Sequence, residues 1–232
     1  QQLENSQGGM IGGRGALDLS ADDGLDNRGG AISAGAGLTA QAAKIDNAGG
    51  AMESEAALTL GASGQLNNAK GSLLSNQRQS LKAGSLNNDD GDIVSRAAFK
   101  LQTGAASNQG GRITSLGDGE IQLDQLDNGG GKLQSGGALT LLSQGEIKNQ
   151  QGRISAQRTM RLDGSALRNQ HGTLAGGEGI ELRAGQMDNQ DGAVASQHGL
   201  SLTLDTLDNR DGKMQTLGEM TLSSAGLLNN QG

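Results

Sequence analysis

Several residue types are missing from this chain or nearly so. It has no Cys, Trp, Tyr or Pro, one Phe (Phe99) and two His (His171 and His198). The two His lie in different repeats and there is no Cys, so neither a zinc site nor a nucleophile–base pair can be assembled from these residues. The chain also lacks the aromatic platforms that sugar-active enzymes usually place beside their acids. We therefore expect no enzyme activity, no cofactor and no metal.

Acidic side chains outnumber basic ones by 25 to 18, which gives a net charge of −7. A nucleic-acid-binding surface is basic, so no nucleic acid partner is expected. The longest apolar runs are far shorter than the roughly 20 residues that span a bilayer, so no membrane span is expected either. With 33% apolar residues and 41 Gly, the composition alone would indicate disorder.

An Asn that recurs every 20 to 22 residues overrides that expectation. A fixed short period along the whole chain indicates that one small structural unit is stacked many times. Asn suits a corner of such a unit because its amide can bond the turn backbone, and stacked Asn side chains can bond one another along the axis. The predicted structural ladder is Asn5, Asn27, Asn47, Asn68, Asn88, Asn108, Asn128, Asn149, Asn169, Asn189, Asn209 and Asn230.

A Gly stands three residues after the Asn in all eleven complete repeats. We interpret it as a turn residue with a positive φ, which a Cβ would strain. These predicted turn glycines are Gly8, Gly30, Gly50, Gly71, Gly91, Gly111, Gly131, Gly152, Gly172, Gly192 and Gly212.

Apolar residues recur two positions apart, as in Leu58 and Leu60 or Leu139 and Leu141. This spacing is typical of a strand with one buried and one wet face. At +5 after the Asn the residue is always aliphatic or Met and is expected to face inward, whereas Ile11, at +6, is expected to face outward. Some 20 residues of extended chain cannot bury their own apolar side, so the coils must stack. We predict an all-β parallel β-helix of about 11 coils of 20–21 residues, with residues 1–232 as one repeat array.

Two surface features could carry chemistry or binding. Asp26 and Asp46, and again Asp188 and Asp208, should stack one coil apart. They could serve a polysaccharide-active enzyme or a weak cation site, although Asp is also a common turn residue. The second feature is a basic column at +4 in three successive repeats, which could touch an anionic glycan or a lipid headgroup; it comprises Arg112, Lys132 and Arg153.

The unit Leu-Asp-Asn-Arg-Gly-Gly-Ala-Ile-Ser-Ala at 25–34 returns in similar form at 45–54 and 207–216. It resembles the filamentous haemagglutinin repeat of two-partner-secretion exoproteins, and the resemblance covers nearly the whole chain. It implies a right-handed β-helix that an outer-membrane transporter exports and that is displayed on the surface of a Gram-negative cell. One copy departs from the pattern, with Ala106 where Leu is usual, so we expect a looser or smaller cross-section there.

The regular positions all serve the fold, so the leading hypothesis is a structural shaft within a longer exoprotein. The shaft would present a receptor-binding tip, a carboxy-terminal toxin for contact-dependent growth inhibition, or both. The alternatives are an adhesin segment that binds host or bacterial surface glycans and, more remotely, a polysaccharide-active enzyme. A target-cell receptor would bind other regions of the exoprotein. Open strand edges at the two ends also predict end-to-end self-association of this segment.

Overall fold

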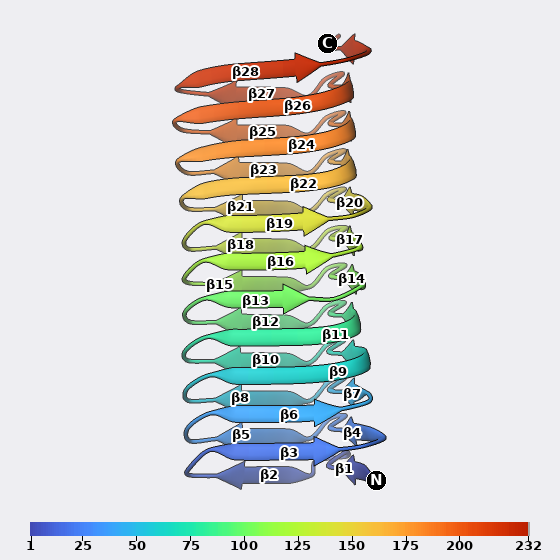
Figure 1. Ribbon diagram of the computed structural model, residues 1–232, viewed down its shortest axis with the longest axis vertical. Coiled ribbons are helices and arrows are strands. Elements are labelled where there is room, and N and C mark those ends of the chain that lie inside the picture. The colour runs from blue at the N-terminus through green and yellow to red at the C-terminus, as the bar shows by residue number, and fades with distance from the viewer. Residues whose placement is uncertain (232) are drawn as a thin grey trace.

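The computed structural model describes residues 1–231; Gly232 lies outside the described residues. The described residues form 29 strands and no helix, and the strand pairings are parallel. Figure 1 shows the strands stacked along the long axis, with the N-terminus at the bottom and the C-terminus at the top. As the chain rises, its near strands run left to right and its far strands run right to left, so the helix is right-handed. The predicted parallel β-helix of about 11 coils is confirmed.

One face of the rod is a sheet of eleven short strands, one from each coil. Its strands are β2 (Met10–Gly13), β5 (Ala31–Ala34), β8 (Ala51–Ser54), β10 (Ser72–Ser75), β12 (Asp92–Ser95), β15 (Arg112–Ser115), β18 (Lys132–Ser135), β21 (Arg153–Ala156), β23 (Thr173–Gly176), β25 (Ala193–Ser196) and β27 (Lys213–Thr216).

The other two faces belong to a bent sheet of eighteen strands. In some coils one long strand continues round the bend, and in the others two shorter strands share the path. The strands are β1 (Gln2–Glu4), β3 (Leu17–Ala21), β4 (Gly24–Asp26), β6 (Leu38–Ala42), β7 (Ile45–Asp46), β9 (Leu58–Asn67), β11 (Gln79–Asn87), β13 (Phe99–Gln102), β14 (Ala105–Ser107), β16 (Gly119–Leu123), β17 (Gln125–Asp127), β19 (Leu139–Ser143), β20 (Glu146–Lys148), β22 (Thr159–Arg168), β24 (Gly179–Asp188), β26 (Gly199–Asp208), β28 (Glu219–Ser224) and β29 (Leu228–Asn229).

The core is a single column of aliphatic side chains along the rod axis. In β9 the alternation places Leu58, Leu60 and Leu66 inside, each at most 1% exposed. Ala106 is buried as well, and the same coil carries Phe99, the one aromatic residue, also buried. Strand β14 keeps its parallel pairing with both neighbours around Ala106, so the departure from the Leu pattern does not interrupt the sheet.

The first coil differs from the sequence-based register. Ile11 pairs with Ile32 and packs against the core, while Met10 is 84% exposed. The expectation that Met10 faces inward and Ile11 outward was therefore wrong. The reason is one additional residue in the turn after Asn5, which shifts the following strand by one position and exchanges its two faces.

Candidate functional site

The Asn side chains form one continuous hydrogen-bonded ladder inside the rod. Each Asn Nδ2 donates to the Oδ1 of the Asn in the next coil, over 2.5–2.7 Å at every step from Asn5 to Asn230. The same Nδ2 also donates to backbone carbonyls at the corner; for Asn27 these are Gly30 O at 3.3 Å and Ala51 O at 3.0 Å. The ladder members between the two ends are almost fully buried. Their amides are therefore occupied by one another and by the backbone, and they offer nothing to a ligand.

The Gly three residues after the Asn is required for space. At Gly131, an added Cβ would lie 2.0 Å from Asn108 O and 2.8 Å from Asn128 Oδ1. The corresponding glycines from Gly30 to Gly212 meet the same two kinds of atom, with the carbonyl at 1.9–2.3 Å. The proposed positive φ at these positions was wrong for ten of the eleven glycines, because only Gly8 has one. In coil 1 the glycine that packs closely against the ladder Asn is Gly9, on which a Cβ would lie 2.7 Å from Asn5 O.

The positive φ belongs to the residue before this Gly. That position holds Gly in some coils and a non-Gly residue at φ of 53–57° in the others, namely Lys70, Asp90, Gln151, His171, Asp191 and Asp211. Two different constraints therefore act on adjacent residues of the turn. One is a left-handed backbone, which non-Gly residues adopt at some cost, and the other is a close approach that only Gly satisfies.

The residue before the ladder Asn has its side chain outside the core, and in many coils it caps the turn that follows. In seven coils its side-chain oxygen accepts the N–H of the residue two places further on, as Asx turns do. These residues are Asp26, Asp46, Asn67, Asn87, Asp127, Asp188 and Asp208.

The paired carboxylates belong to this capping row, and their environment is unsuited to general acid catalysis. The hydrogen-bonded guanidinium of Arg28 holds the pKa of Asp26 below its usual value, and Arg210 does the same to the pKa of Asp208. A carboxyl that serves as a general acid near neutral pH needs a raised pKa. Asp188 Oδ2 accepts a hydrogen bond of 2.6 Å from Gln170. These carboxylates are therefore committed to turns and surface pairs.

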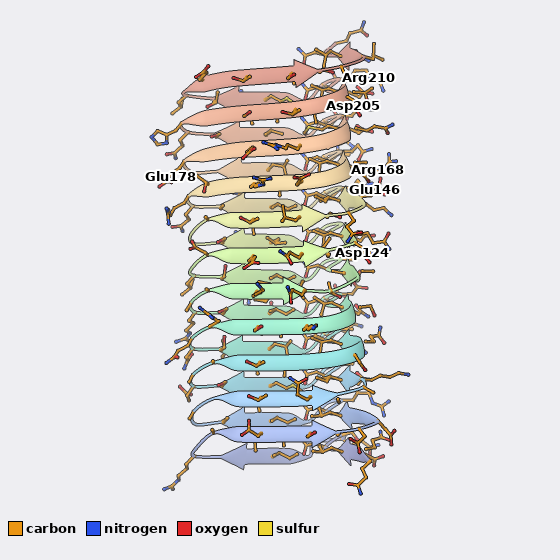
Figure 2. The ribbon with its side chains drawn as sticks, viewed as in Figure 1. Asp124, Glu146, Arg168, Glu178, Asp205 and Arg210 are labelled. Carbon is orange, nitrogen blue, oxygen red and sulfur yellow. The ribbon has the colours of Figure 1, made fainter. Side chains whose placement is uncertain are left out.

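The remaining charged side chains are spread over the outside of the rod. Figure 2 shows Asp124, Glu146, Arg168, Asp205 and Arg210 at one edge and Glu178 at the opposite edge, all pointing away from the axis. His171 and His198 are exposed in different turns. Within residues 1–231, no group of three or more His, Cys, Asp or Glu side chains could hold a metal ion. No helix that could cross a membrane is present in the same range.

The three residues of the predicted basic column stack in register on one face of the rod. Arg112 pairs in register with Lys132, and Lys132 with Arg153. The three cations lie on β15, β18 and β21, and all three are exposed. Arg112 Nε lies 2.8 Å from Asp92 Oδ1 in the coil below. Across residues 1–231, no ion pair engages Lys132 or Arg153. The upper two cations are therefore available to an external anion.

A groove of about 730 Å³ lies beside this column on the same sheet. It is lined by small residues on β21, β23 and β25, namely Ser155, Ala175 and Ala195, and also by Arg153. These lining residues are in register in successive coils, so the groove runs along the rod axis.

Two interior features were not recognised in the sequence. Ser135 is buried, and its Oγ lies 2.8 Å from Gly117 O in the previous coil and 2.9 Å from Ala138 O; the frequent Ser at +7 was the signal. Gln79 replaces an aliphatic residue in the core, is fully buried, and has no hydrogen-bond partner for either amide atom among the described residues.

The closed rod, its internal amide ladder and the dispersed outer charges define a structural β-solenoid. The chain belongs to the haemagglutinin repeat family, whose model matches residues 12–74, 57–118 and 103–232. Repeats of this family are structural and adhesin-like and occur in secreted, surface-displayed filamentous proteins of Gram-negative bacteria. No curated protein and no solved structure matches the chain.

Proposed function

We propose that this segment is a rigid spacer within a longer exported filament, and that residues 1–232 act as one uninterrupted shaft. The observation that supports it most is the use of the side chains. The side chains that repeat in every coil are used by the core, the ladder and the close corner, whereas the outward charges change from coil to coil. A stack in which every coil bonds both neighbours resists bending, as a spacer must.

The experiment that tests the spacer is a binding screen of the isolated segment together with electron microscopy. Straight rods of uniform width that bind neither cells nor a glycan array are the expected result. Tight and saturable binding of a receptor by the isolated segment would show that it is a recognition module and would overturn the proposal.

Export through an outer-membrane two-partner-secretion transporter and toxin delivery to a neighbouring cell are the finer part of this proposal. Family membership supports them, since this repeat implies a two-partner-secretion context. The test is a competition assay between producing and target bacteria with the full-length protein. Target killing that is lost when the transporter is deleted is the expected result, and adhesion without killing would favour a filamentous adhesin.

The second candidate function is recognition of anionic surface glycans by the basic column and its groove. It is favoured by two unpaired cations in adjacent coils of an otherwise acidic chain. Charge reversal of Arg112, Lys132 and Arg153 together should abolish binding to glycosaminoglycan-coated surfaces. Lys213→Glu, in the same outward row but remote from the column, is the matched control. Equal binding by the triple variant and the control would eliminate this candidate.

A further inference from the structure

The coils are not all equal, and beyond the first coil, which has 22 residues, the unequal ones recur in a fixed order. We number the coils 1 to 11, each from its ladder Asn, so coil 1 begins at Asn5 and coil 11 at Asn209. Coils 3, 7 and 11 have 21 residues, and every other coil from coil 2 onward has 20. Three coils of 20 residues and one of 21 make a unit of 81 residues. Two such units, 68–148 and 149–229, follow each other without a gap.

In coils 3, 7 and 11 the extra residue is at the bend of the eighteen-stranded sheet, where it forms a bulge. Coil 1 also has one residue more than coil 2 at this bend, between Ala21 and Leu25. Coils 7 and 11 both read Thr-Leu-x-Ser-x-Gly there, at 140–145 and 221–226. Ser143 Oγ donates to Asp124 O over 3.0 Å, and Ser224 Oγ donates to Asp205 O over 2.9 Å. The two bulges therefore rest on the coil below through the same contact, although they lie 81 residues apart.

The coil above a bulge has two small residues at the bend. In coil 4 these are Ala83 and Gly84, and a Cβ on Gly84 would lie 2.9 Å from Ser63 O. In coil 8 they are Gly164 and Ser165, and a Cβ on Gly164 would lie 3.2 Å from Gly145 O. The strand register shifts between Ala83 and Ser85, where one residue faces the two of the bulge.

The next two coils complete the cycle. Coils 5 and 9 have Gly104 and Gly185 at the bend, where a Cβ would lie 2.7 or 2.9 Å from the carbonyl below. Coils 6 and 10 end in Leu-Asp-x-Leu-Asp, in which the first Asp is Asp124 or Asp205. A Cβ on Gly104 would lie 3.4 Å from Asp124 Oδ2, and a Cβ on Gly185 would lie 3.4 Å from Asp205 Oδ2. Figure 2 shows these acids, Asp124 and Asp205, at the same edge of the rod with Glu146 between them.

We propose that the unit from which this shaft is built is a module of four coils, and that a bulged coil is covered only by a coil with two small residues at the bend. Each module then adds four coil spacings, or about 19 Å, to the rod. The open upper face of coil 11, which exposes Met220, Leu222 and Leu228, is such a bulged face. The partner that it fits is a coil of the kind that begins at Asn68 or Asn149. This inference concerns how the rod is assembled, and it stands whether or not the rod acts as a spacer.

The first test changes the bend of coil 8 in the full chain. The double variant Gly164→Leu/Ser165→Asp gives coil 8 the bend residues of coil 10, Leu204 and Asp205. Ser165→Ala, which keeps two small residues at the bend, is the matched control. We expect the double variant to melt at a lower temperature and its amides in β20 and β22 to exchange about tenfold faster, because this local structure opens more readily. Deletion of Gly145 from the double variant removes the bulge and should restore both values. Damage that this deletion leaves unchanged would overturn the proposal.

The second test compares two internal deletions. In both of them, apolar core residues meet across the new junction between coils. Deletion of 68–148 removes one module, so the bulge of coil 3 is again covered by coil 8. Deletion of 149–188 removes only two coils, but it places coil 10 on the bulge of coil 7. Stability of a solenoid normally rises with the number of repeats. We expect the opposite here: the shorter chain should melt at the higher temperature. If the chain with more coils melts higher, or the one-module deletion does not fold, the module is not the building unit.

Discussion

Replacement of Asn128 by Leu tests whether the amide ladder stabilises the rod or only fills the corner. Asn128 is fully buried, donates to Asn149 Oδ1 over 2.7 Å and accepts from Asn108 Nδ2 over 2.7 Å. Leu is close in volume but forms neither bond. Asn149 Oδ1 then loses the one donor that the ladder provides, while Asn108 Nδ2 keeps weaker contacts of 3.3 Å to the carbonyls of Gly111 and Lys132.

The expected cost follows from these two groups. A buried polar atom that loses its partner costs about 1–3 kcal/mol. One acceptor is orphaned completely and one donor in part, so Asn128→Leu should reduce the free energy of unfolding by about 2–4 kcal/mol. Asn230→Leu, at the exposed end of the ladder, breaks only the bond to Asn209. Its cost should be a fraction of the cost at the centre.

Urea unfolding followed by circular dichroism measures the global loss, and amide hydrogen exchange measures where it occurs. Long repeat arrays can depart from two-state behaviour, so the exchange data decide. Protection should fall most in the coils that start at Asn108, Asn128 and Asn149. If the central and terminal variants lose the same stability, or the central variant loses none, the ladder is not a stabilising element.

Three further predictions follow from the corner, the core and the surface. Gly131→Ala should be strongly destabilising in thermal melts, because its Cβ would lie 2.0 Å from Asn108 O; a small loss would mean that the corner relaxes readily. Gln79→Leu should raise the free energy of unfolding by about 1–3 kcal/mol, since it removes an unpaired buried amide, and an unchanged urea midpoint would contradict this. Arg28 lowers the pKa of Asp26, so their pair stabilises the folded chain above the usual carboxyl pKa and is lost as pH falls below about 4. Arg28→Gln should therefore flatten the acid side of the stability profile, and a profile identical to the parent would refute the assignment.

The architecture could be predicted from the sequence because one physical requirement repeats in every coil. Leu58, Leu60 and Leu66 must all face the axis, so their spacing shows both the strands and the stacking. The reason for the invariant Gly could not be predicted in the same way. Gly serves both for positive φ and for close approach, and a sequence does not separate the two uses; only the contact between Gly131 and Asn108 O does.

The role of the outward acids was harder to predict for a related reason. Asp26 and Asp46 one coil apart could be a catalytic pair, a cation site or two turn caps, and all three need the same residue type. The N–H groups of Arg28 and Ala48 decide the matter, because each bonds the carboxylate two residues before it. Gln79 lay beyond sequence reasoning altogether, since a polar residue at one core position looks like an ordinary exception until its lack of partners is seen.

A rod of this kind separates the residues that fold it from those that could recognise something else. The inward positions and the corner are restricted in every coil, whereas an outward position has no such requirement. In the row that contains Ala31, the outward residue becomes Asp92, then Arg112 and Lys132, without any change in the pairing of the strands. A binding surface on such a rod must therefore be a patch of adjacent coils whose outward residues differ in chemistry from the other residues of the same row. In this row the basic column meets that criterion. Charge reversal of the column therefore discriminates most directly between a shaft that acts only as a spacer and one that also binds a ligand.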